Sequence, residues 1–325
     1  MFVLDSHCDT PSHILNHRDL SLDNELAQVD FPKLERGGVD GAFFALYIPA
    51  ELDTEAARNH MYAMLEGVKR TIKDNQNRAA FAVSRSQALQ NKSQGLFSVF
   101  LGLENGSPLG QDEAAFELLQ SLYNEGVRYI TLCHSEANQI CDSCASKSPK
   151  WGGLSPFGKQ LVAEMNRIGM LVDVSHISDS SFYDVLACST KPVVATHSCC
   201  RALAGHPRNM TDDMIRALAQ RGGVIQINFY PVFLDASYSE TLSDERPSFK
   251  LIADHIDHVV SLVGIDHVGI GSDFDGIDVV PEGMEDISML PKLFDELRSR
   301  GYTEEELIKI AGENFFRILA EAESV

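Results

Sequence analysis

Short apolar runs recur along the chain, and most are separated by segments in which hydrophobic residues recur at helical spacing. These runs are rich in β-branched and aromatic residues, a composition typical of strands. Strands that alternate with helices indicate a parallel sheet, and eight of them predict one (β/α)8 TIM barrel of the α/β class. The eight runs are residues 2–9, 41–48, 96–104, 127–134, 170–176, 192–197, 223–228 and 267–273.

Helix signals lie between these runs and after the last one. Long helical patterns cover about residues 54–74 and 112–123, and Ser155-Pro156 is typical of a helix start. The capping box from Thr303 to Glu306 starts a final amphipathic helix, so we expect additional helices at the C-terminus. A chain of 325 residues could form two domains, but it contains no Pro/Gly/Ser-rich linker. We therefore expect one barrel domain over residues 1–325.

Ionisable side chains close most of the predicted strands. In a (β/α)8 barrel the carboxyl ends of all strands meet at one mouth, which is where such folds carry their active sites. A single histidine at a strand end is more often structural, but several donors at one mouth indicate a functional site. The residues are His7 and Asp9 after the first run, Glu104 after the third, His134 after the fourth, His176 after the fifth, His197 after the sixth and Asp273 after the eighth.

Five of these side chains form a set that suits metal binding. Imidazole nitrogens and carboxylate oxygens without thiolates favour zinc, manganese, iron or cobalt. Five donors are too many for a single catalytic ion that keeps a position open, whereas two ions sharing Glu104 would use them all. Two ions about 3.5 to 4 Å apart would hold a bridging water and present hydroxide at neutral pH. The five are His7, Asp9, Glu104, His176 and His197.

Charge and cysteine content limit the classes of partner and the cellular location that we expect. A formal net charge of -20 argues against nucleic acid or an anionic membrane as partner. No apolar run approaches the roughly 20 residues of a membrane helix, and the N-terminus carries no secretory pattern. Seven cysteines without a dense framework favour a reducing cytoplasm, and the isolated pair Cys141 and Cys144 predicts no structural zinc site. We expect a soluble cytoplasmic protein that handles a small ligand.

Several segments together resemble the renal (membrane) dipeptidase family of metal-dependent amidohydrolase barrels. They are DSHCDTP, GLENG, TLCHSEANQICDS, GLSPFGKQLVAEMNRIGMLVDVSHIS, ATHSCCRALAGHPRNMTDD and GIGSDFDG, in order from about residue 3 to 320. The resemblance implies a TIM barrel that hydrolyses dipeptides. It also implies that one zinc is held by His7, Asp9 and Glu104, and the other by Glu104, His176 and His197.

The same resemblance implies roles for three further residues. His134 would contact the substrate and the tetrahedral intermediate, Arg208 would bind the dipeptide carboxylate, and Asp273 would be the acid/base aspartate. A forked guanidinium suits a free carboxylate. Asp275 competes with Asp273 for the proton-transfer role but lies two residues further from the strand end.

Substrate choice and assembly are less constrained. The family tolerates a D-configured C-terminal residue, so Xaa-D-Xaa dipeptides are candidate substrates. The absence of secretory and lipid-anchor signals resembles the soluble microbial branch of the family, and residues 141–151 depart from the family pattern. Two alternatives stay open, namely another amidohydrolase activity on a lactone, cyclic amide or deamination substrate, and a non-catalytic metal-binding homologue. The sequence also leaves open whether the chain forms a homodimer.

Overall fold

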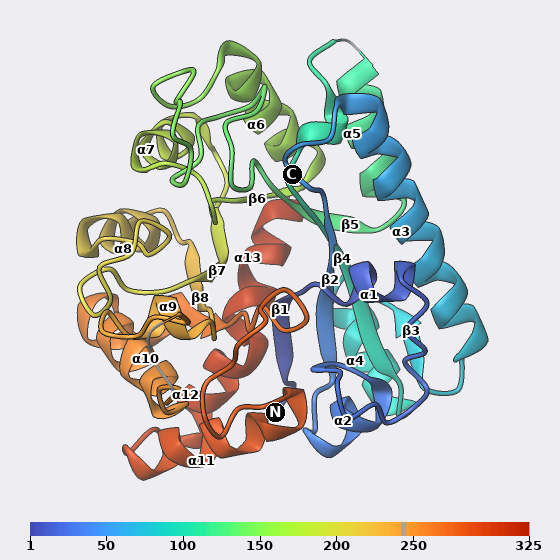
Figure 1. Ribbon diagram of the computed structural model, residues 1–325, viewed down its shortest axis with the longest axis vertical. Coiled ribbons are helices and arrows are strands. Elements are labelled where there is room, and N and C mark those ends of the chain that lie inside the picture. The colour runs from blue at the N-terminus through green and yellow to red at the C-terminus, as the bar shows by residue number, and fades with distance from the viewer. Residues whose placement is uncertain (113, 242–244, 325) are drawn as a thin grey trace.

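Parallel strands form a nearly closed barrel in the computed structural model, which describes residues 1–112, 114–241 and 245–324 (Figure 1). The strand order is β1-β2-β4-β5-β6-β7-β8-β9, and β3 pairs with β4 outside this path. The strands are β1 (Leu4–Cys8), β2 (Gly41–Tyr47), β3 (Ala79–Phe81), β4 (Phe97–Glu104), β5 (Val127–Thr131), β6 (Leu171–Asp173), β7 (Val194–Ser198), β8 (Val224–Ile227) and β9 (Val268–Ile270).

The ring closes between β1 and the segment that follows β9. The N–H of Asp9 donates to the carbonyl of Phe274 at 2.9 Å, and the N–H of Asp273 donates to the carbonyl of His7 at 3.0 Å. Residues from the two ends of the sheet are therefore neighbours. The predicted TIM barrel is confirmed, and each of the eight predicted runs overlaps one strand of the ring.

Helices alternate with the strands and cover the outside of the barrel. Asp53 caps α3, Ser155 caps α6 and Thr303 closes the predicted capping box, so the polar signals fall at real helix starts. The helices are α1 (Thr10–Leu15), α2 (Phe31–Arg36), α3 (Thr54–Asp74), α4 (Arg85–Ser93), α5 (Ala114–Asn124), α6 (Pro156–Ile168), α7 (Asp179–Cys188), α8 (Asp212–Gln220), α9 (Pro231–Leu234), α10 (Lys250–Val263), α11 (Leu290–Ser299), α12 (Glu304–Ile308) and α13 (Asn314–Glu323).

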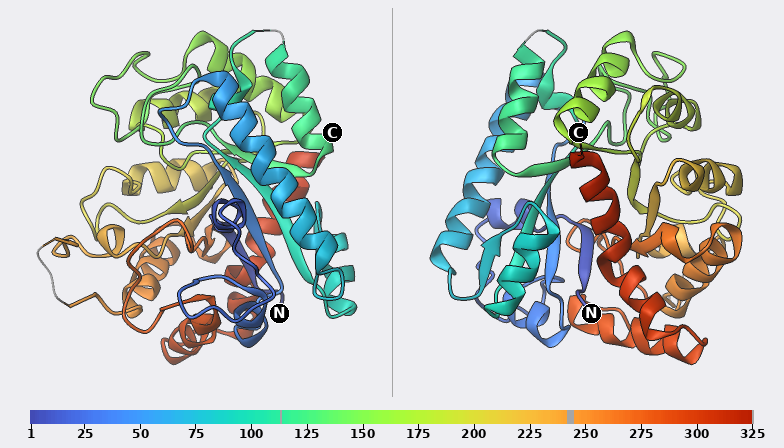
Figure 2. Two further views of the ribbon diagram at one scale, coloured as in Figure 1. Left: turned by 45° about the vertical axis from the view of Figure 1, so that its right-hand side comes forward. Right: turned by 180° about the vertical axis from the view of Figure 1, so that it is seen from behind.

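The additional C-terminal helices expected from the sequence are α12 and α13. Helix α13 lies across the back of the barrel (Figure 2), where the Phe315 ring packs against Phe43 of β2 in a tilted arrangement with 4.8 Å between ring centroids. Both rings are fully buried, and they belong to a core cluster that also contains Phe100 and Tyr129. This packing fills the barrel with aromatic side chains and leaves its opposite mouth to the polar residues.

Two details differ from the sequence prediction. Strand β3 was not predicted, because it has only three residues and is partly exposed. Strands β5, β6 and β9 end before His134, His176 and Asp273, which lie in the loops that follow. His176 and Asp273 have positive φ values of 71° and 67°, so the chain has left the extended conformation there. Within the described residues, no helix is long and apolar enough to cross a membrane.

Candidate metal centre

The residues predicted from the strand ends gather at one mouth of the barrel. His7 lies in β1, Glu104 ends β4 and His197 lies in β7, so the sheet itself fixes three of them. Asp9 precedes α1 directly, and the remaining three follow β5, β6 and β9 within a few residues. The structure thereby brings together side chains that are up to 266 positions apart, from His7 to Asp273.

One group of potential ligands surrounds the end of β1. His7 Nε2 lies 3.4 Å from Asp9 Oδ2 and 3.5 Å from Glu104 Oε2. One ligand atom from each of the three residues lies within 4.8 Å of the other two, and all three are buried. This group matches the first zinc site that the family resemblance implies.

A second group shares Glu104 with the first. Glu104 Oε1 lies 2.9 Å from His176 Nε2 and 3.5 Å from His197 Nε2, and the two Nε2 atoms are 2.8 Å apart. The two oxygens of Glu104 therefore face different donors: Oε2 faces His7, and Oε1 faces His176 and His197. A carboxylate with this orientation can contribute to two cation sites at once.

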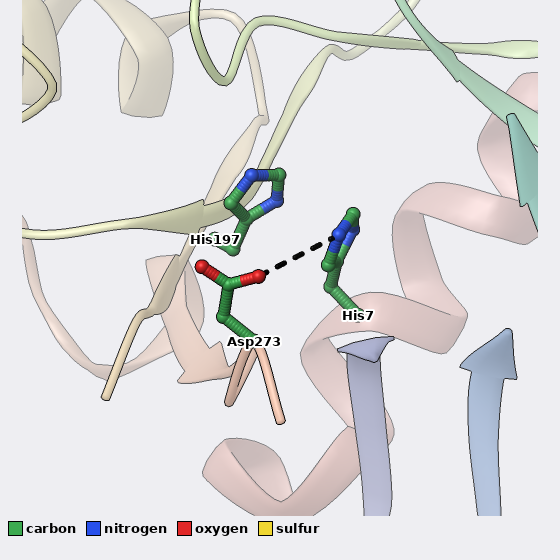
Figure 3. A group of neighbouring side chains, drawn as sticks. All are labelled: His7, His197 and Asp273. Atoms are coloured by element: carbon green, nitrogen blue, oxygen red, sulfur yellow. Dashed lines mark ion pairs between the residues drawn. The ribbon is translucent and has the colours of Figure 1, made fainter. Parts of the chain in front are cut away.

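Asp273 faces both groups from the loop after β9 (Figure 3). Its Oδ1 lies 3.9 Å from His7 Nε2, while its Oδ2 accepts a hydrogen bond from Asn228 Nδ2 at 2.8 Å. Asn228 Oδ1 accepts the N–H of Tyr230 at 2.6 Å, which fixes the amide with its NH2 group toward Asp273. Asn228 closes the seventh predicted run but was not predicted as a site residue, because its amide side chain is not ionisable.

The electrostatics of the five potential ligands fit a divalent cation. His7 Nε2 and Asp9 Oδ1 are buried without a hydrogen-bond partner. Burial raises the pKa of Asp9 well above its usual value, and the charge of Glu104 raises it further. Burial lowers the pKa of His176 well below its usual value, with help from Arg208, which keeps the imidazole in the neutral form that binds metals. A cation would satisfy the orphaned atoms and offset the repulsion between the carboxylates.

In His7 and Glu104, charged neighbours shift the pKa in the direction opposite to the shift that burial alone would cause. Burial alone would lower the pKa of His7, but the neighbouring Glu104 and Asp9 raise it well above its usual value. Burial alone would raise the pKa of Glu104, but His7, His176 and His197 hold it well below its usual value. Glu104 therefore stays ionised, and the site attracts positive charge at the position of His7 Nε2.

Two adjoining cavities open onto these residues. One of about 300 Å³ is lined by Asp9, Glu104, His134, His176 and Asp273, among others. The other, of about 240 Å³, shares the last three of these residues. The space is sufficient for a small molecule and gives it direct access to the potential ligands.

Arg208 lines the second cavity, and one of its two terminal guanidinium nitrogens has no hydrogen-bond partner. Its Nη2 donates to the carbonyl of His197 at 3.1 Å, and its guanidinium lies 5.3 Å from the centre of the Phe233 ring. Its Nη1 is buried without a partner. The Nδ1 atom of His134 is also buried without a partner, and burial lowers the pKa of this histidine. Both residues thus offer unused polar atoms beside the potential ligands.

Asp275, the competitor of Asp273, is occupied elsewhere. Arg18 Nη1 donates to its Oδ1 at 2.6 Å, and Thr10 Oγ1 donates to its Oδ2 at 2.8 Å. The N–H of Gln28 adds a third bond to Oδ1 at 3.2 Å. This carboxylate ties the N-terminal segment to the loop after β9, and both of its oxygens accept hydrogen bonds within that contact.

The long segment that follows β5 reaches the site through Ser143. Its Oγ lies 2.5 Å from the carbonyl of His134 and 3.2 Å from that of His176, so it joins two loops that carry site residues. Cys141 and Cys144 flank this serine as free thiols. Among the described residues, neither cysteine belongs to a group of potential metal ligands.

Comparisons with known proteins find relatives along the whole chain. The sequence pattern of the membrane dipeptidase family, peptidase family M19, matches residues 1–325. Dipeptidase verJ of Clonostachys rogersoniana is 34% identical over 340 residues, covering 99% of this chain and 84% of that protein. Dipeptidase aclJ of Aspergillus oryzae is 34% identical over 328 residues, covering 97% of this chain and 74% of that protein.

Solved structures give the same result for the fold. The metallopeptidase from Rhodobacter sphaeroides, liganded with a phosphinate mimic of the dipeptide L-Ala-D-Ala, has a TM-score of 0.90 and 26% identity over 99% of both chains. The probable dipeptidase PvdM from Pseudomonas aeruginosa has a TM-score of 0.88 and 26% identity over 99% of this chain and 96% of that chain.

Proposed function

The chain belongs to the membrane dipeptidase family, peptidase family M19, and is a metal-dependent hydrolase of dipeptides, for which we propose a binuclear zinc centre bridged by Glu104. The observation that carries the proposal is the orientation of Glu104, whose Oε2 faces His7 and whose Oε1 faces His176 and His197. Zinc suits these nitrogen and oxygen donors, and manganese, iron or cobalt can bind the same set.

Each cation would have three protein ligands. His7, Asp9 and Glu104 would hold one, and Glu104, His176 and His197 would hold the other. When bound, two such ions lower the pKa of a water between them, so that hydroxide is available at neutral pH, and they polarise the substrate carbonyl. Three ligands per ion leave coordination positions open, as a catalytic site requires.

Arg208 would bind the α-carboxylate of the dipeptide. Its Nη1 is buried and unpaired, so a carboxylate that enters the adjoining cavity would give it the missing acceptor. The Nη2 bond to the carbonyl of His197 fixes the guanidinium at a constant position relative to the donors. A substrate anchored in this way has its peptide bond close to His134 and Asp273, which line the same cavity.

Proton transfer falls to Asp273 and stabilisation of the developing oxyanion to His134. Asp273 Oδ2 is held by Asn228, while Oδ1 faces the site and can accept a proton and pass it to the leaving amine. His134 has a buried Nδ1 without a partner, and the imidazole lines both cavities. A positioned donor of this kind stabilises negative charge where water is excluded.

We extend the proposal to dipeptides with a D-configured C-terminal residue. The relative from Rhodobacter sphaeroides is liganded with a mimic of L-Ala-D-Ala, and it is 26% identical to this chain.

We also propose that residues 1–325 form a single barrel domain, since β1 and the segment after β9 close the ring. Seven free cysteines support a reducing cytoplasm as the location.

A panel of L,L and L,D dipeptides tests the proposal, with the C-terminal amide of each peptide as the matched control. We expect hydrolysis of the free dipeptides, weak hydrolysis of the amides, and complete loss of turnover with a chelator that zinc restores. Turnover that survives full removal of metal would contradict the metal assignment. Equal turnover of dipeptides and amides would contradict the role of Arg208.

A further inference from the structure

We propose that Asp173, acting through the hydroxyl of Thr196, is a positioning residue that keeps the Nε2 lone pair of His197 directed at the metal centre. The inference rests on the proposed function, because it concerns how one of the proposed ligands is prepared to bind a cation. Neither Asp173 nor Thr196 lines the two cavities. Their effect would therefore reach the reaction indirectly, through the residues that they contact.

The residues involved come from three adjacent strands. Thr131 ends β5, Asp173 ends β6 and Thr196 lies in β7, one position before His197. The strand register pairs Thr131 with Asp173 and Asp173 with Val194. All four side chains of this group are fully buried, so water does not compete for their hydrogen bonds.

The carboxylate of Asp173 is surrounded by four donors. Its Oδ1 accepts the backbone N–H groups of Ser175 at 3.0 Å and Thr196 at 2.9 Å. Its Oδ2 accepts the hydroxyls of Thr131 at 2.5 Å and Thr196 at 2.7 Å. Both oxygens thus act as acceptors, which is the role of a carboxylate that carries no proton.

The hydrogen count then fixes the tautomer of His197. A threonine hydroxyl has a single hydrogen, and Thr196 gives it to Asp173. The Thr196 oxygen lies 2.8 Å from His197 Nδ1, so in this contact the oxygen must accept and Nδ1 must carry the imidazole proton. Nε2 is left with its lone pair, the state in which an imidazole binds a metal ion.

His197 Nε2 points to the position where the lone pair is needed. It lies 2.8 Å from His176 Nε2 and 3.5 Å from Glu104 Oε1, and the His197 ring packs against the His7 ring with 3.8 Å between centroids. The other proposed centre has no such constraint. His7 Nδ1 lies 2.8 Å from the hydroxyl of Tyr129, which can either donate or accept. The hydrogen-bonded chain from Asp173 through Thr196 to His197, called the relay below, therefore acts on the His176/His197 site.

Three substitutions separate the relay from general packing. Thr196→Val keeps the shape of the side chain but removes the oxygen that accepts from His197. Thr196→Ser retains that oxygen. Thr131→Val is the matched control, because it also removes a hydroxyl donor from Asp173 but leaves the contact between Thr196 and His197 in place.

Zinc affinity of the full chain is measured by competition with a chelator of known affinity. We expect Thr196→Val to weaken one of two zinc equivalents by about 10- to 100-fold, the usual effect of removing a hydrogen-bond partner behind a metal-bound histidine. Thr196→Ser and Thr131→Val should bind both equivalents as the wild type does. Unchanged zinc affinity in Thr196→Val, or an equal loss in Thr131→Val, would overturn the relay.

Nitrogen NMR of the metal-free protein reads the tautomer of His197 directly. With 15N-labelled histidine, and His197→Asn to assign the signal, we expect the proton of His197 on Nδ1. In Asp173→Asn the amide can donate to Thr196, whose hydroxyl then donates to Nδ1, so the proton moves to Nε2. If the proton of His197 lies on Nε2 in the metal-free wild type, the relay is overturned, even when the same protein binds two zinc ions in the affinity measurement. Wild-type protein that binds no zinc would instead overturn the proposed centre.

Discussion

Gly276 offers a sharp test of the site, because its missing side chain leaves room for two of the carboxylates. A Cβ atom at this position would lie 2.2 Å from Asp9 Oδ2 and 2.8 Å from Asp273 Oδ1. Ordinary contact requires at least 3.4 Å, so Gly276→Ala would displace the Asp9 carboxylate by about 1 Å. The perturbation reaches a proposed metal ligand and the proposed proton carrier without replacing either.

The size of the effect follows from that displacement. A misplacement of about 1 Å can lower turnover by about 100-fold, equivalent to about 2.7 kcal/mol of transition-state stabilisation. The fold should persist, because Gly276 is exposed and its φ is not in the left-handed region. We therefore expect a large fall in kcat/KM with a nearly unchanged Tm.

The assay compares kcat/KM for a small L,L dipeptide, zinc content and Tm in the wild type and the variant. Gly205→Ala is the matched control, since a Cβ there meets no atom within 4 Å and its φ is also outside the left-handed region. The control should match the wild type in all three measurements. Wild-type kcat/KM and zinc content in Gly276→Ala would refute the placement of Asp9 and Asp273 around a shared centre.

Three further substitutions address separate parts of the account. Asp273→Asn should keep both zinc equivalents and lower kcat by about 10²- to 10⁴-fold, the usual contribution of a general acid/base; near-normal turnover would remove Asp273 from this role. Arg208→Leu should raise KM for dipeptides at a cost of about 2 kcal/mol, roughly 30-fold, and should abolish the preference over C-terminal amides; a preserved preference would argue against the carboxylate contact. Burial lowers the pKa of His255 to about 4, so the folded state binds fewer protons than the unfolded state and the free energy of unfolding should fall by about 3 kcal/mol as the pH drops from 6.5 to 4. In His255→Gln, urea unfolding should show a correspondingly smaller loss over that range, and an equal loss would assign the acid sensitivity to other groups.

The ring of strands and the gathering of donors could be predicted because both follow from local patterns. Apolar runs mark the strands, and parallel strands bring their carboxyl ends to one mouth, so a donor at the end of each run had to lie near the others. The family resemblance then added Arg208, which lies 11 positions beyond His197 and carries no strand-end signal of its own.

Other features depend on register and backbone turns that the sequence does not display. The contacts of Asp173 with Thr131 and Thr196 join three strands, and a polar residue inside an apolar run does not indicate which neighbours it faces. The positive φ values of His176 and Asp273 are equally hidden, because residues other than glycine rarely adopt them. Strand β3 is too short to produce a hydrophobic pattern.

The central claim is that Glu104 joins two cation sites at the mouth of the barrel. A crystal structure of the zinc-loaded protein with anomalous scattering at the zinc absorption edge tests it directly. We predict two zinc peaks flanking Glu104, one beside His7 and Asp9 and the other beside His176 and His197. A single peak, or peaks remote from Glu104, would contradict the account.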